Sequence, residues 1–116
     1  MKKAFFLLPL LAAAYAFAFV APPVYPGAKP VQELDQAAKD VGQDRSAYNT
    51  SDSFDKVYEF YKSKGSEMTR AHRDGPREKS AMILFTDAGY TVMISWKETS
   101  KSHGTVIHIA KGVPSR

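Results

Sequence analysis

Three runs of β-branched and aromatic residues in the last third of the chain constrain the fold more than any other feature. They are Ala81–Phe85, Tyr90–Trp96 and Thr105–Ile109, and polar loops separate them. Residues of these types are typical of strands, and short loops join neighbouring strands that run in opposite directions. The sequence therefore predicts a three-stranded antiparallel meander.

The loop between the first two runs sets their register. A four-residue loop that ends at Gly89 pairs Phe85 with Tyr90 and uses the glycine for a positive φ. This register gathers the bulkiest apolar side chains on one face of the sheet. The further pairs on that face are Ile83 with Val92, Ala81 with Ile94, and Ile94 with Ile107.

The clearest helix begins after Ser51-Asp52-Ser53, because hydroxyl and carboxylate side chains are typical N-caps. Apolar residues then recur at helical spacing, and Gly65 follows as the expected terminator. We expect the resulting apolar stripe to pack on the apolar face of the meander. The stripe consists of Phe54, Val57, Tyr58, Phe60 and Tyr61.

Weaker patterns complete the domain. Ser46–Thr50 and Glu67–His72 are expected to be further strands, and Val31–Asp44 is expected to be a short helix or an irregular loop. The predicted fold class is α+β, with one amphipathic helix packed on an antiparallel sheet of four to five strands.

A Pro-rich N-terminal lead-in precedes this domain. Val20–Pro30 contains four prolines and one glycine, which predicts an extended segment that either docks on the domain or serves as a tether. Tyr25-Pro26-Gly27-Ala28 is typical of a turn. The expected organisation is a signal peptide at 1–18, the Pro-rich lead-in with the short helix or loop at 19–45, and the α+β domain at 46–116.

The first eighteen residues have the pattern of an export signal. Lys2 and Lys3 precede an uncharged apolar run, and small residues flank Phe17. We expect cleavage after Ala18, or else after Ala16, and a periplasmic or secreted product. The alternative is an uncleaved N-terminal membrane anchor.

Composition excludes several classes of protein. The chain has no cysteine, so it carries neither a lipoprotein signal nor a disulfide. Its formal charge of +4 falls to +2 when Lys2 and Lys3 leave with the signal. A bias this small predicts no nucleic-acid partner.

No catalytic or metal-binding motif is recognisable. His72, His103 and His108 stand apart, without the second histidine or cysteine that a metal site needs at close spacing. Ser102-His103 lacks the surroundings of a catalytic nucleophile. We therefore assign no catalytic residue, no metal and no cofactor from the sequence.

A basic cluster around one polar turn is the nearest approach to a ligand signal. It would suit an anionic lipid or glycan, although acidic residues interrupt it and an ordinary charged hairpin tip explains it as well. The candidate anion-binding residues are Arg70, His72, Arg73, Arg77 and Lys79.

The second face of the meander has no predicted helix to cover it. Its occupant would be the lead-in, the segment Val31–Asp44, another copy of the chain or an envelope protein. A related possibility is that Thr105–Ala110 is an unpaired edge to which a partner adds a strand. The candidate partner face consists of Met82, Leu84, Met93, Val106 and His108.

Two stretches carry a family resemblance: VYPGA at Val24–Ala28 and YNTSDSFDKVYEFYKSKG at Tyr48–Gly65. In them the chain resembles small exported bacterial domains of uncharacterised function. In such domains a similar lead-in and capped helix precede an antiparallel sheet that ends in a T-x-I-x-I strand, here Thr105–Ile109. The glycine-tryptophan pair expected after the helix is absent. The resemblance implies a fold and brings no functional residue with it.

Two functional hypotheses follow. The first is a non-enzymatic binding or accessory domain, since no catalytic constellation is recognisable and one sheet face is left uncovered. The alternative is a small hydrolase-like envelope enzyme whose site is assembled from scattered residues. Its candidates are Tyr58, His72, His103 and His108, and two of them beside a carboxylate in one pocket would favour it.

Overall fold

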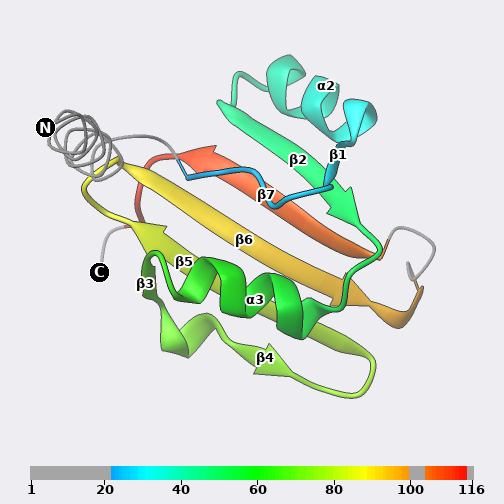
Figure 1. Cartoon of the computed structure of the whole chain (residues 1–116). Coiled ribbons are helices and arrows are strands. Elements are labelled where there is room, and N and C mark those ends of the chain that lie inside the picture. The colour runs from blue at the N-terminus through cyan, green and yellow to red at the C-terminus, as the bar shows by residue number, and fades with distance from the viewer. Residues whose placement is uncertain (1–21, 100–103, 115–116) are drawn as a thin grey trace, which may run out of the picture.

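A seven-stranded antiparallel sheet forms the body of the domain (Figure 1). The structure is a computed structural model that describes residues 22–99 and 104–114, so the predicted signal peptide and its cleavage site lie outside the described residues. In chain order the elements are β1 (Lys29–Pro30), α2 (Gln32–Asp40), β2 (Arg45–Thr50), α3 (Phe54–Lys62), β3 (Ser66–Glu67), the 3₁₀ helix η1 (Thr69–Ala71), β4 (Arg73–Asp74), β5 (Glu78–Phe85), β6 (Tyr90–Lys97) and β7 (Thr105–Lys111).

The predicted meander is confirmed residue by residue. Strands β5 and β6 pair Phe85 with Tyr90 and Ile83 with Val92, and Gly89 has a φ of 74°. Between β6 and β7, Ile94 lies opposite Ile107. The period of two therefore placed the side chains on the correct faces.

The sheet is larger than the expected four to five strands. Its order is β1-β2-β7-β6-β5-β3, and β4 also pairs with β5. The additional strands β1, β3 and β4 have two residues each, which is too short to show a period in the sequence. The strand expected at Glu67–His72 is wrong beyond Glu67, because the chain turns into η1.

Strand β7 lies inside the sheet. It pairs with β2 on one side and with β6 on the other. The idea that Thr105–Ala110 is an open edge for a partner strand is therefore wrong, because both rows of its backbone hydrogen-bonding groups are occupied.

Helix α3 packs on the apolar face of the sheet, as predicted. Ser53 is its N-cap, and the Ser53 hydroxyl accepts a hydrogen bond from the Lys56 amide at 3.3 Å. The core of the domain joins this helix to strands β5, β6 and β7. Its fully buried side chains include Val57, Tyr61, Ile83, Val92, Ile94 and Ile107.

Gly65 ends this region for a reason that differs from the expected one. Its φ is not positive, so it is no left-handed cap. A Cβ at this position would lie 2.7 Å from Ile83 Cγ2 and 2.8 Å from the Leu84 carbonyl oxygen. Glycine is needed here because the chain passes so close to β5.

The lead-in docks on the domain from Pro22 onward. Tyr25 is buried in the core, and its hydroxyl donates a hydrogen bond to the Asp52 carboxylate. Tyr61 donates a hydrogen bond to the Pro23 carbonyl oxygen at 2.8 Å. The predicted turn is also present, with Gly27 at a φ of 83°.

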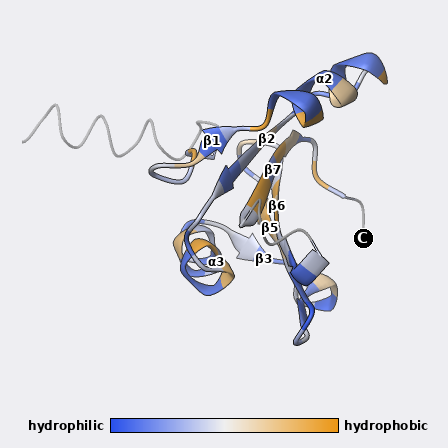
Figure 2. Ribbon diagram, turned by 90° about the vertical axis from the view of Figure 1, so that its right-hand side faces the viewer, coloured by the Kyte–Doolittle hydropathy of each residue, from blue (hydrophilic) through white to orange (hydrophobic). Residues whose placement is uncertain are grey.

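The segment Val31–Asp44 was expected to be either a short helix or an irregular loop, and it forms the helix α2. It lies at the end of the sheet formed by β1 and β2 (Figure 2). Its Asp35 carboxylate accepts a hydrogen bond of 2.7 Å from the Ala47 amide, on the side of β2 that faces away from β7. The helix thereby closes part of an otherwise open sheet edge.

Candidate functional site

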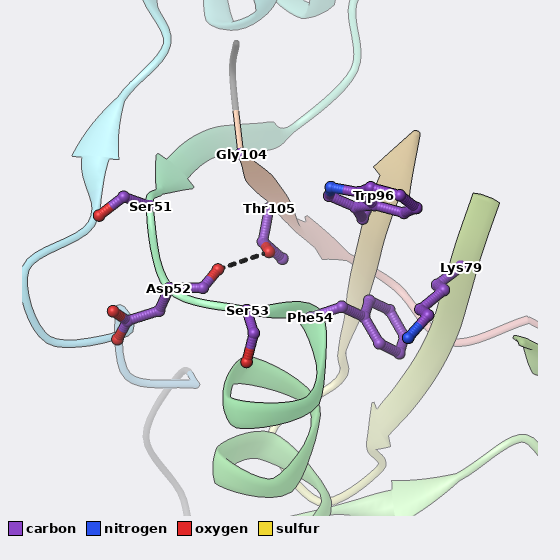
Figure 3. Close-up of a pocket in the computed structure, with 8 residues that line it drawn as sticks. All are labelled: Ser51, Asp52, Ser53, Phe54, Lys79, Trp96, Gly104 and Thr105. Atoms are coloured by element: carbon purple, nitrogen blue, oxygen red, sulfur yellow. Dashed lines mark hydrogen bonds between the residues drawn. The ribbon is translucent and has the colours of Figure 1, made fainter. Parts of the chain in front are cut away.

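A pocket of about 270 Å³ opens where the start of α3 meets the ends of three strands (Figure 3). Its size is just below the range of about 300–1,000 Å³ that is usual for ligand sites. The residues that line it are Ser51, Asp52, Ser53, Phe54, Lys79, Trp96, Gly104 and Thr105.

The polar side chains at one side of this pocket already serve the fold. Thr105 donates a hydrogen bond of 2.8 Å to the Asp52 carbonyl oxygen. The Asp52 carboxylate is bound to Tyr25, and the Ser53 hydroxyl caps α3. In Figure 3 the Asp52 carboxylate points away from Trp96 and Lys79. These groups are therefore committed to positioning the pocket.

Three other side chains are free to contact a ligand. Lys79 and Trp96 are directly opposite each other in the β5–β6 ladder, and Phe54 lies beside them at the start of α3 (Figure 3). The Lys79 ammonium group lies 3.7 Å from the exposed Asp74 carboxylate, a surface pair of little strength. An indole, a phenyl ring and an ammonium group suit a small molecule with an apolar face and a negative charge.

A second group of polar side chains lies further along α3. The Tyr58 hydroxyl donates a 2.6 Å hydrogen bond to one oxygen of Glu67, and His72 Nδ1 lies 2.7 Å from the other oxygen. The Tyr58 and His72 rings meet edge to face at 5.1 Å between centroids. Phe54 stacks on Tyr58 at 5.9 Å, so a row of rings connects this Tyr58–Glu67–His72 cluster to the pocket.

Burial and hydrogen bonding act in opposite directions on the pKa of Glu67. Burial alone would raise it, but the hydrogen bonds from Tyr58 and His72 favour the charged carboxylate and lower the pKa overall. The same carboxylate raises the pKa of Tyr58. Glu67 is therefore an ionised acceptor that orients both rings.

Of the four residues considered for a catalytic site, the structure brings two together. Tyr58 and His72 share Glu67, whereas His108 lies on the opposite face of the sheet and His103 lies outside the described residues. Glu67 was missed because only the pairing of β3 with β5 turns it toward α3. None of the three clustered residues lines the pocket.

The five candidate anion-binding residues have different partners. Arg73 donates to the carbonyl oxygens of Arg70 and His72, both at 3.1 Å, and so folds back on η1. His72 faces Glu67, and Arg77 is exposed with Glu98 at 4.0 Å. Lys79 alone reaches the pocket. Anion binding by the five together stays a prediction.

The candidate partner face lies on the side of the sheet opposite α3. Leu84 is buried there, whereas Met82, Met93, Val106 and His108 are half-buried. Partner binding at this face stays a prediction.

The described residues contain neither a cluster of common metal ligands nor a membrane-spanning helix. Across residues 22–99 and 104–114, no group of three or more histidines, cysteines or carboxylates is placed to hold a metal ion. Within the same ranges, no helix is long and apolar enough to span a bilayer. No protein-family model, curated protein or solved structure matches the chain.

Proposed function

We propose that the chain is a small exported, non-enzymatic binding or accessory domain, and that the pocket beside Trp96 binds its ligand. The observation that carries this proposal is that some side chains of the pocket wall are hydrogen-bonded within the fold, whereas others remain to contact a ligand. The side chains of Asp52, Ser53 and Thr105 are held by the fold, whereas the rings of Phe54 and Trp96 and the ammonium group of Lys79 remain to contact a ligand. Such groups suit the binding of a ligand that has an apolar face and a negative charge.

The same groups indicate the class of ligand. Phe54 is buried and fixed by its stacking on Tyr58, so it offers a rigid apolar surface. Lys79 lies opposite Trp96 and is held loosely by Asp74. A planar or apolar body with one carboxylate or a similar anion fits this combination.

Trp96 provides the test, because it is the only tryptophan in the chain and it lines the pocket. We expect benzoate to change the tryptophan fluorescence in a saturable way, and benzyl alcohol to do so less well because it has no charge for Lys79. The variant K79Q should weaken benzoate binding. The matched control K56Q, on an exposed part of α3, should not. A linear response to benzoate, or equal effects of both variants, would contradict the proposal.

Export is tested separately, on cells that express the full sequence. A mature protein that begins at Phe19 in the envelope or the medium supports it. A full-length protein in the cytoplasm contradicts it. In-cell crosslinking followed by mass spectrometry of the captured protein and lipid then distinguishes a ligand-binding domain from an accessory subunit with a stoichiometric partner.

The Tyr58–Glu67–His72 cluster meets half of the condition for the alternative function, a small hydrolase-like enzyme: two candidates share a carboxylate, but none of the three residues lines the pocket. Glu67 orients His72 through Nδ1, which leaves Nε2 as a general base. Hydrolysis of p-nitrophenyl acetate that is lost in H72Q and kept in the control H108Q would support this alternative. Equal background rates for the wild type and both variants would remove it.

A further inference from the structure

A row of sulfur and imidazole side chains crosses the face of the sheet opposite α3. In the strand registers Met82 lies opposite Met93, and Met93 lies opposite His108. Met68 extends this row, because its amide donates a 2.9 Å hydrogen bond to the Met82 carbonyl oxygen. We call these four residues, Met68, Met82, Met93 and His108, the methionine row.

The orientation of Glu67 shows on which face of the sheet Met68 lies. Glu67 points to Tyr58 on the α3 side, and Met68 has an extended backbone with φ −87° and ψ 90°. Successive side chains of an extended chain point to opposite faces, so Met68 is on the same face as Met82. Directly opposite residues on one face have Cβ atoms about 4.5–5.5 Å apart, so each member of the row is a neighbour of the next.

The composition of the row is unusual for this chain. The sequence has four methionines, and three of them are in the row, while the fourth is Met1. All three of these methionines are half-buried. The thioether groups are therefore collected at one place instead of filling gaps in the core.

His108 has a nitrogen atom without a partner. Its Nδ1 is buried and makes no hydrogen bond within the described part of the chain. Burial, together with the nearby Arg45, lowers the pKa of His108 and outweighs the opposite effect of Asp35. The unpartnered Nδ1 is thus an imidazole nitrogen that the described part of the fold does not use, and an imidazole nitrogen is a common metal ligand.

Thioether sulfur selects a soft cation. Hard cations such as Mg²⁺ and Ca²⁺ take oxygen ligands, and Zn²⁺ takes thiolate, imidazole or carboxylate ligands. Cu(I) accepts both thioether and imidazole ligands. We propose that Met82, Met93 and His108 bind one Cu(I) ion on this face of the sheet, with Met68 as a further thioether beside Met82.

The spacing of the row is compatible with one shared ion. Met82 and His108 are on strands about 10 Å apart, with Met93 between them. Methionine has three rotatable bonds, so the side chains of Met82 and Met93 can lean toward the less flexible imidazole of His108 without any movement of the sheet. The ion enters already as Cu(I), so binding involves no electron transfer.

The competing explanation is a methionine-rich docking surface for a protein, since flexible thioethers also suit adaptable apolar contacts. Two substitutions separate the explanations. M93L keeps the apolar volume and removes the central sulfur, a change that cores tolerate well. V106A removes apolar surface two residues from His108 and leaves all four members of the row in place.

The experiment is a competition for Cu(I) between the purified protein and a chromophoric chelator, under anaerobic reduction. We expect a one-to-one complex. M93L and H108Q should each weaken it by more than about tenfold, because even the outer partners of metal ligands contribute about 10–100-fold. V106A should leave it unchanged. Ag(I), a redox-stable substitute, should shift the methyl resonances of Met82 and Met93 in the NMR spectrum.

Three results would overturn the proposal. The first is the absence of a one-to-one complex, and the second is a complex that M93L and H108Q leave as strong as before. The third is a silver titration that moves only the resonance of Met1 or none. A protein that self-associates or captures a partner through this face, with V106A disruptive and M93L not, would assign the row to docking instead.

Discussion

Removing the Tyr61 hydroxyl tests how firmly the lead-in is held to the domain. Tyr61 is fully buried, and its hydroxyl donates to the Pro23 carbonyl oxygen at 2.8 Å. Burial raises the pKa of Tyr61 far above its usual value, so the hydroxyl stays protonated and acts as a donor at every working pH. The variant Y61F keeps the ring in the core and deletes this one bond between α3 and the lead-in.

The expected loss follows from that bond alone. A neutral hydrogen bond contributes about 0.5–1.5 kcal/mol net, and an abandoned acceptor adds a further penalty when water cannot reach it. Pro23 is half-buried, so water compensates its carbonyl oxygen in part. We expect Y61F to lower the free energy of unfolding by about 1 kcal/mol, which lowers Tm by about 4–8 °C for a domain of this size.

Thermal unfolding followed by near-ultraviolet circular dichroism measures this loss. The matched control is Y90F, because Tyr90 is half-buried against the same core and its hydroxyl makes no hydrogen bond within the described residues. The control should stay within about 0.5 kcal/mol of the wild type, because it keeps the ring in place and removes a hydroxyl that has no partner among the described residues. Equal Tm values for Y61F and the wild type would refute the reasoning and indicate that the bond between Tyr61 and Pro23 does not contribute to stability.

Three further predictions concern the edges of the domain. G65A should lower the urea midpoint by the equivalent of about 1–3 kcal/mol, because the new Cβ would meet Ile83 and the β5 backbone, and an unchanged midpoint would contradict the close approach. The pKa of Glu67 is lowered in the folded state, so its charged carboxylate stabilises the fold above about pH 4.3. This contribution is lost as the pH falls through the folded pKa. In E67Q the free energy of unfolding should therefore change less between about pH 3 and pH 6 than it does in the wild type. D35A should speed hydrogen exchange at the Ala47 amide, which loses its acceptor, and unchanged protection there would count against the role of α2 as an edge cover.

The long strands and the main helix were predictable because apolar residues recur along each of them at the spacing of a strand or of a helix. Alternation together with the four-residue loop that ends at Gly89 paired Ile83 with Val92, and alternation across the next loop paired Ile94 with Ile107. The same register pairs Lys79 with Trp96 in the pocket wall. The two-residue strands carry no such signal. Their positions depend on long-range hydrogen bonds that follow from tertiary structure.

The candidate sites were harder to predict for the same reason. Met82, Met93 and His108 were assigned to one face from the sequence, but Met68 joins them only through the short β3 pairing. Likewise, Tyr58 and His72 meet because the chain reverses through η1 and presents Glu67 between them. Thioethers are not among the usual ligands of zinc, calcium or magnesium, so the methionines carried no metal signal in the sequence.

The central place of β7 has a consequence for the order in which the domain is made. Strand β7 follows both β2 and β6 in the chain but lies between them in the sheet, so the backbone pairing across this gap forms only when residues 105–111 are present. Such a chain closes its sheet through pairings between distant segments, which fold slowly. A cut between β6 and β7 would therefore leave β2 without its partner strand and expose an edge of β6, so the two sides of the sheet depend on one strand for their connection.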